Sequence, residues 1–185
     1  MFILLVATSL LFSSFQQPTP PALSCAPELK ETFVTLEQLP EASQLIAKIL
    51  EEGPLHIRSN HHLSEEFAGY WSPSERTIFI TPSSDHPLST LLFEMHNALR
   101  TSDFRELDQL AYLNQVSRKE YIKRQEYLEY QNALETSALL DKGMQEELFP
   151  QGSGWYPAET FDKHFRIQRS SGHSAWIGKA YDQLS

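Results

Sequence analysis

One segment without proline or glycine, residues 117–142, limits the folds open to this chain more than any other feature. Ser117 and Glu120 form a capping-box pattern at its start, in which the two side chains satisfy free backbone N–H groups of the first helical turn. Gly143 follows the last residue, and glycine commonly ends helices. We therefore predict one long helix that ends at Gly143.

Shorter elements surround this helix in the sequence. Two β-prone runs, Phe67–Trp71 and Thr77–Thr81, flank a Ser-Pro-Ser-Glu turn and predict a hairpin. Residues 55–59 have the composition of a further strand. Helical patterns are expected from Pro40 to Gly53, from Pro87 (capped by Ser84 or Asp85), over 102–116, around 158–168 and over 173–184. This order predicts an α+β fold, mostly helical, with a small sheet or hairpin beside the central helix.

The first 24 residues predict an export signal. Residues 2–12 are apolar but too few for a stable membrane anchor, and Ala22-Leu23-Ser24 places small residues before a cut ahead of Cys25. We expect a signal peptide over 1–24, a proline-rich flexible linker over 25–33, and a single domain over 34–185 that is periplasmic or secreted. A buried N-terminal strand or helix is the alternative.

Composition limits the partners. The formal charge is −9, with 24 acidic and 15 basic residues and no basic stripe, so nucleic acid and anionic membranes are poor partners. No transmembrane anchor is expected in the mature chain. Cys25 is the only cysteine, which excludes an intrachain disulfide. Ala-Leu-Ser is a poor lipobox, which argues against a lipid anchor on Cys25 but leaves that alternative open.

The helix that begins at Pro87 presents two contrasting faces. Phe93, Glu94 and Asn97 lie opposite the apolar stripe, and a phenylalanine on that side needs a cover, so we expect another segment to pack there. A solvated face with Glu94 as an ordinary surface acid is the alternative. The apolar stripe, which should face the core, consists of Leu88, Leu91, Leu92, Met95 and Leu99.

The long helix offers a polar partner for this face. Gln125, Glu129, Asn132 and Thr136 follow one another at helical spacing, and a functional interpretation places Glu129 opposite Glu94. Two carboxylates in one partly dry site raise the pKa of one of them. Such a pair suits general acid–base catalysis or a hard cation. A solvated stripe is again the alternative.

Three segments resemble small zinc peptidases of the gluzincin type in their order and spacing. These segments are GYWSPSERTIFI (69–80), LLFEMHNA (91–98) and YLEYQNA (127–133). Such peptidases carry a hairpin, then a helix with His-Glu-x-x-His, then a helix that supplies a Glu ligand. The resemblance covers roughly residues 55–140 and implies a zincin-like fold.

Only the glutamates of that family match here. The resemblance puts Glu94 at the general-base position and Glu129 at the third-ligand position, whereas Phe93 and Asn97 stand where the two histidines belong. Phenylalanine cannot bind zinc and an amide is a weak zinc ligand. The resemblance therefore implies a degenerate motif, Phe-Glu-x-x-Asn-Ala, and a proteolytic mechanism does not transfer.

The histidines do not restore a metal site by their spacing, so we predict no metal ligand and no cofactor. His96 borders the apolar stripe and is expected to be a packed imidazole. The others considered lie in loops, before a helix or in the tail: His61, His62, His86, His164 and His173.

Two functional hypotheses follow. The favoured one is an exported zincin-like domain without zinc peptidase activity, which acts as a binding or effector module for a protein or small peptide. The alternative is an extracytoplasmic hydrolase with Glu94 as general base, helped by Glu129, by Asn97 or by a histidine from the tail, with zinc as a cofactor in one version. The candidate catalytic residues are Glu94 and Glu129, and the candidate ligand-binding residues are Phe93, Asn97, Gln125 and Asn132.

Overall fold

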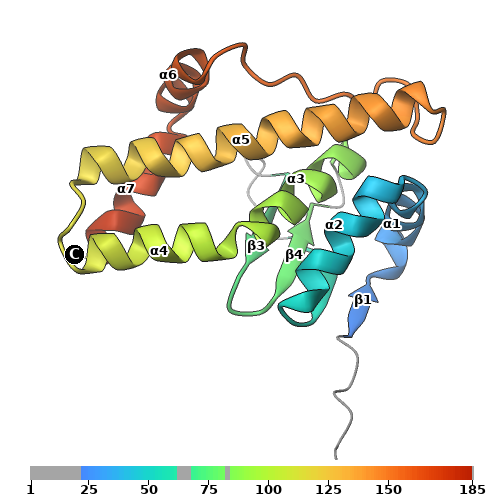
Figure 1. Cartoon of the computed structure of the whole chain (residues 1–185), viewed down its shortest axis with the longest axis horizontal. Helices are drawn as coiled ribbons and strands as arrows, with labels where there is room; N and C mark the ends of the chain where they lie inside the picture. Colours follow the sequence, from blue (N-terminus) through green and yellow to red (C-terminus); the bar gives the residue numbers. More distant parts are fainter. Residues whose placement is uncertain (1–21, 62–67, 82–83, 185) are drawn as a thin grey trace, which may run out of the picture.

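The computed structural model describes residues 22–61, 68–81 and 84–184. These residues form seven α-helices and a four-stranded sheet, which confirms the α+β class and the mostly helical composition (Figure 1). The helices are α1 (Lys30–Glu37), α2 (Pro40–Glu51), α3 (Pro87–Leu99), α4 (Thr101–Tyr112), α5 (Arg118–Gln145), α6 (Phe161–Ser171) and α7 (His173–Leu184). The strands are β1 (Leu23–Cys25), β2 (Leu55–Ser59), β3 (Gly69–Ser72) and β4 (Thr77–Ile80), and Pro27–Leu29 form a 3-10 turn.

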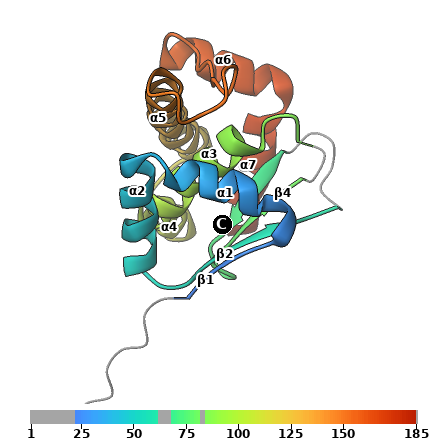
Figure 2. The ribbon, with the colours of Figure 1, turned by 90° about the vertical axis from the view of Figure 1, so that its right-hand side faces the viewer.

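The long helix α5 connects two groups of elements. At one end, α1, α2 and α3 pack together beside the sheet; at the other end, α4, α6 and α7 surround α5 (Figures 1 and 2). Helix α3 lies between α5 and the β3–β4 hairpin and contacts both. None of the helices in the described part of the chain carries an apolar stretch long enough to cross a membrane.

The sheet has the strand order β1-β2-β4-β3. Strands β1, β2 and β4 run parallel, while β3 is antiparallel to β4 in the predicted hairpin, with Gly69 opposite Ile80 and Ser72 opposite Thr77. Gly69 allows this edge strand to approach α3, because a Cβ there would lie 2.8 Å from Thr90 Cγ2 and 2.8 Å from the Phe79 carbonyl oxygen. The hairpin is thereby held against the helix that carries the motif.

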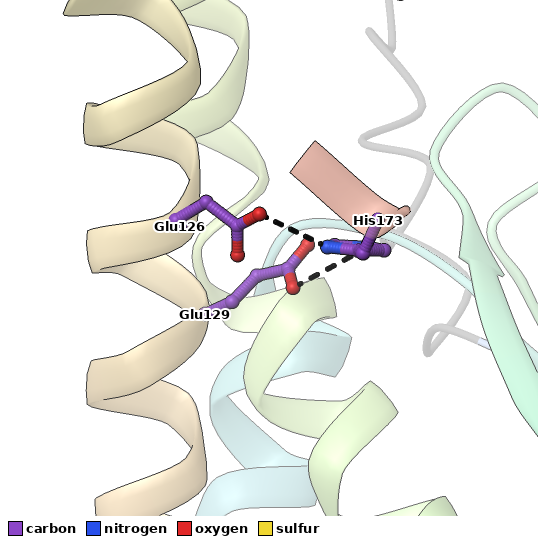
Figure 3. Close-up of side chains that lie close together, drawn as sticks. All are labelled: Glu126, Glu129 and His173. Carbon is purple, nitrogen blue, oxygen red and sulfur yellow. Dashed lines mark hydrogen bonds and ion pairs between the residues drawn. The ribbon is translucent and has the colours of Figure 1, made fainter. Parts of the chain in front are cut away.

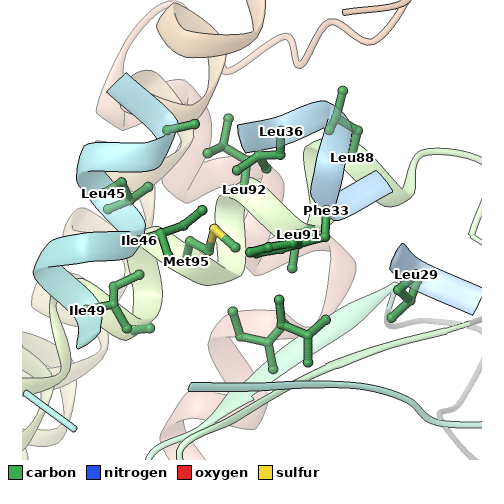
Figure 4. Close-up of a cluster of buried hydrophobic side chains, with 14 of the residues drawn as sticks. Leu29, Phe33, Leu36, Leu45, Ile46, Ile49, Leu88, Leu91, Leu92 and Met95 are labelled. Atoms are coloured by element: carbon green, nitrogen blue, oxygen red, sulfur yellow. The ribbon is translucent and has the colours of Figure 1, made fainter. Parts of the chain in front are cut away.

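The main core fills the space between α1, α2, α3 and the sheet (Figure 4). Four of the five residues of the predicted α3 stripe, Leu88, Leu91, Leu92 and Met95, are buried in it, and Leu99 packs partly buried against it. A second, smaller cluster lies between α4, α5 and α7 and contains Leu107, Ala111, Val116, Tyr121 and Ile177. The described chain therefore has two apolar cores, and α5 contributes to both.

The predicted linker over 25–33 is wrong. Cys25 pairs with Ile57 in the sheet, and Leu29 and Phe33 are each only 5% exposed in the main core. Prolines drew the prediction, but Pro27 serves as the first residue of the 3-10 turn, where its missing N–H costs nothing. The proposed signal peptide lies almost wholly outside the described residues; of residues 1–24, the structure describes 22–24.

Helix boundaries differ from the prediction at two places. The N-cap of α3 is His86 without a side-chain hydrogen bond, rather than Ser84 or Asp85. Helix α5 begins with the predicted cap, in which the Ser117 hydroxyl accepts from the Glu120 N–H, but it continues past Gly143 to Gln145. Glu147 adopts the left-handed conformation that Gly143 was expected to supply, with a φ of 58°.

Gly143 has a packing role instead. The ring of Phe149 lies against it, and a Cβ at position 143 would sit 2.1 Å from Phe149 Cδ2. The Gly143 carbonyl also accepts hydrogen bonds from the N–H groups of Leu148 and Phe149. The missing side chain therefore lets the chain after α5 fold back and bury Phe149 in the main core.

Gly143→Ala is expected to destabilise the protein. Helix propensity alone favours alanine by about 1 kcal/mol, but the added methyl group overlaps a buried ring, and such overpacking costs about 1–3 kcal/mol. Urea unfolding followed by circular dichroism measures the difference. In a Phe149→Ala background the overlap disappears, and the same substitution should become stabilising. Stabilisation by Gly143→Ala in the wild-type background would contradict this account.

Candidate functional site

Glu94 is buried on α3 and contacts the edge strand of the sheet. Its side chain belongs to a residue that is only 6% exposed, and its carboxylate accepts hydrogen bonds from the Asn97 amide at 2.8 Å and from the Trp71 backbone N–H of β3. Burial raises the pKa of Glu94 to about 7, against the opposing effect of these two hydrogen bonds. Glu94 is therefore not a surface acid.

Asn97 continues the contact from α3 to α5. Its Oδ1 accepts from Asn132 Nδ2 at 2.7 Å, and Asn132 Oδ1 in turn accepts from Arg100 Nε at 2.5 Å. The guanidinium of Arg100 also bonds the Glu135 carboxylate. Asn132 is fully buried, so this chain of hydrogen bonds satisfies side chains that would otherwise destabilise the α3–α5 interface.

Phe93 is covered, as its position on the helix predicts. The cover is the ring of Trp155, from the connection between α5 and α6, which stacks on Phe93 with 5.1 Å between ring centroids and 5° between planes. A connecting segment thus provides the expected cover of Phe93, while α5 contacts the neighbouring Asn97. Two further residues of the polar stripe on α5, Gln125 and Thr136, face inward as well.

Gln125 and Thr136 contribute to the packing of α5 against its neighbours. Gln125 Nε2 donates to the hydroxyl of Tyr121 at 3.0 Å, and that hydroxyl donates to Asp108 at 2.6 Å. Thr136 is fully buried. The predicted stripe therefore lies in helix interfaces and not in solvent.

His96 is buried beside the core stripe, as predicted. Burial, followed by the positive charge of Arg100, lowers the pKa of His96 to about 4, so the imidazole is neutral at physiological pH. Its Nδ1 lies 3.1 Å from a carboxylate oxygen of Glu135. Among the other histidines, His61 is exposed, His86 is the N-cap of α3, and His62 lies outside the described residues.

Glu129 faces a cluster that the sequence pattern did not reveal. One turn before it on α5, Glu126 is completely buried and accepts a hydrogen bond from Ser174 Oγ at 2.5 Å. His173, the first residue of α7, lies between the two acids: its Nδ1 is 3.3 Å from Glu126 Oε1 and its Nε2 is 3.7 Å from Glu129 Oε2 (Figure 3). His164 of α6 lies 3.6 Å from Glu126 through its Nε2.

The pKa values of the two acids of this cluster, Glu126 and Glu129, shift in opposite directions. Burial acts to raise the pKa of Glu126, but its interactions with His164, His173 and Ser174 outweigh burial and lower the pKa to about 2. Burial raises the pKa of Glu129 to about 7; His173 opposes this shift, and the charges of Glu126 and Glu94 add to it. Burial also disfavours the charged form of His173, but its bond with Glu126 and the charge of Glu129 raise its pKa overall.

The charge of Glu94 contributes to the raised pKa of Glu129, but the two acids have different contacts: Glu94 bonds Asn97, and Glu129 faces His173. Their expected pairing stays a prediction. Glu126 and Ser174 were missed, and His164 and His173 were considered only as tail histidines, one of which would assist Glu94. The one usable signal was the spacing of Glu126 and Glu129, which places two acids on neighbouring turns of one helix face. The histidines come from α6 and α7, and no local pattern predicts how these helices fold back onto α5.

The comparisons with known proteins return no match: no family model matches the chain, and neither a curated protein nor a solved structure is significantly similar to it. The zincin-like resemblance therefore stays a prediction, and the functional argument rests on the geometry described above.

Glu94→Gln should change how stability depends on pH. The carboxyl has a pKa of about 7 in the folded protein and about 4.5 when unfolded, so the folded state binds more protons between these values. The contribution of Glu94 to the free energy of unfolding of the wild type therefore falls as the pH rises from 4.5 to 7. Glutamine does not titrate, so whatever constant cost the substitution has, the variant should gain about 3 kcal/mol relative to wild type between pH 4 and pH 8.

Urea unfolding at a series of pH values measures this difference. Leu92→Ala, an uncharged core change on the same helix, is the control and should show a constant deficit across the series. A Glu94→Gln difference that is equally constant would mean that Glu94 has the same pKa in the folded and the unfolded protein.

Proposed function

We propose that this chain is an exported zincin-like domain that lacks zinc peptidase activity and acts as a binding or effector module. The observation that carries the proposal is the engagement of both side chains at the zinc-ligand positions of α3. Phe93 is stacked on Trp155, and Asn97 is hydrogen-bonded to Glu94 on one side and to Asn132 on the other. Export rests on the apolar N-terminal segment of the sequence.

The surroundings of Glu94 support the same conclusion. A general base must reach a water molecule or a substrate proton within hydrogen-bond distance. Glu94 instead accepts from the backbone of β3 and from Asn97 in a position that is 94% shielded from solvent. Its role in the proposal is structural: it attaches the edge strand to α3.

We place the partner in the groove between α4 and α5. This groove has a volume of about 520 Å³ and an apolar floor that includes Leu107, Leu110 and Leu128. Tyr127, which is 47% exposed, stands at its side, and exposed aromatic residues are enriched at protein interfaces. Charged residues of both signs line the rest of it: Asp103, Glu106, Glu120, Lys123 and Arg124. An apolar floor with a mixed charged rim suits a short peptide segment of a protein partner.

A second candidate function is acid–base hydrolysis by Glu94. The burial of Glu94 favours it, because burial raises the pKa of this carboxyl to about 7, where a group exchanges protons most usefully at physiological pH. The charge of Glu94 also contributes to the raised pKa of Glu129, which supports Glu129 as the second acid of this candidate. Solvent would have to reach Glu94 for this mechanism, which its hydrogen bonds and burial oppose.

A peptidase assay separates these two functions. Wild-type protein and Glu94→Gln are incubated with a fluorogenic peptide library at pH 7, with and without added Zn²⁺. The proposal predicts that neither protein cleaves peptides above background. Cleavage by the wild type that falls by 100-fold or more in the variant would overturn the proposal in favour of Glu94 catalysis.

The groove gives a separate prediction about binding. Peptides selected from a display library against the wild-type protein should bind Tyr127→Ala at least 10-fold more weakly, because the ring forms part of the groove wall. Tyr112→Ala is the matched control, since Tyr112 is also on the surface but is not among the groove residues. Equal affinities for wild type and Tyr127→Ala, measured by fluorescence anisotropy, would remove the groove from the proposal.

A further inference from the structure

Glu126, Glu129 and His173 form a convergent set of potential metal ligands. The two glutamates project from neighbouring turns of α5 toward the imidazole at the start of α7 (Figure 3). One ligand atom from each residue can be chosen so that all three lie within 4.8 Å of one another. In a tetrahedral zinc site with bonds of about 2.0–2.1 Å, ligand atoms lie roughly 3.3 Å apart, so only a small closing movement is required.

Two polar atoms in the cluster have no hydrogen-bond partner. Glu126 is 0% exposed, yet its Oε2 accepts no hydrogen bond of normal length, and the buried Nε2 of His164 makes none either. The ion pair that they form with each other is too long to be a hydrogen bond. These two atoms face each other at 3.6 Å. Buried carboxylate oxygens are normally satisfied, because an unpaired one forfeits its hydration without compensation. A cation bound between them would supply the missing interaction.

The donor set indicates the class of cation. Carboxylates alone suit Ca²⁺ or Mg²⁺, whereas imidazole nitrogen suits Zn²⁺ and other first-row transition metals. Two carboxylates also balance the charge of a divalent ion. We propose that Glu126, Glu129 and His173 bind a first-row divalent cation, with Zn²⁺ as the reference ion and His164 as a fourth ligand.

This site differs from the one that the motif helix implies. It takes no ligand from α3, and of the motif-derived residues it uses only Glu129. It is built instead from α5 and the two C-terminal helices. The inference is independent of the proposed binding function, since the site can be occupied whether or not the α4–α5 groove receives a partner.

Metal binding to the full chain tests the proposal. Purified protein is stripped with chelator and titrated with Zn²⁺ and separately with Mn²⁺, and bound metal is measured by mass spectrometry after dialysis. We expect one Zn²⁺ per chain and a rise in the thermal midpoint on saturation. Glu126→Gln, Glu129→Gln and His173→Gln should each weaken Zn²⁺ binding by 100-fold or more.

Two control variants locate the site. Glu94→Gln should retain full binding. Glu135→Gln removes another α5 glutamate, which lies beside His96 of α3 and outside the proposed site, and should also leave binding unchanged. If Glu126→Gln does not fold, which circular dichroism shows, the less buried Glu129 and His173 variants decide the result. The proposal fails if Zn²⁺ does not bind, if binding survives the Glu129 and His173 substitutions, or if Glu94→Gln abolishes it.

Discussion

The buried carboxyl group of Glu94 links three elements, β3, α3 and α5, through one series of hydrogen bonds. It accepts from the backbone of β3 and from Asn97 on its own helix, and Asn97 is bonded in turn to Asn132 on α5. This series of hydrogen bonds starts from the guanidinium of Arg100, and every donor in it points toward Glu94. Because each polar atom depends on its neighbour, the positions of the hairpin, α3 and α5 are specified together.

Periodicity predicted the elements of this arrangement better than their connections. The α3 stripe, the hairpin and the Ser117 cap all follow from local spacing, which is a property of one segment at a time. The requirement that Phe93 be covered was also readable from the helical wheel, but not that Trp155 covers it. The linker prediction for residues 25–33 was wrong because the sequence alone does not distinguish a proline that starts a turn from a proline in a linker.

The cluster of Glu126, His164 and His173 could not be predicted from local spacing. Residues 126, 164 and 173 are brought together by the return of α6 and α7 along α5, and that return depends on aromatic packing between distant segments. Phe161 contacts Tyr127 and Tyr130 of α5, and Tyr130 contacts His164. Spacing in the sequence carries no information on such contacts. It does show that Glu126 and Glu129 place two carboxylates close together on one face of α5.

The division into two apolar clusters has a consequence for how the molecule opens. Leu140 anchors one end of α5 in the main core and Tyr121 anchors the other in the smaller cluster, while the polar residues lie between them. Units with separate cores exchange their amide protons by separate local unfolding events, and the smaller core protects less strongly. We therefore expect the C-terminal helices to detach while the sheet stays folded, and this local opening would expose Glu126 to solvent transiently.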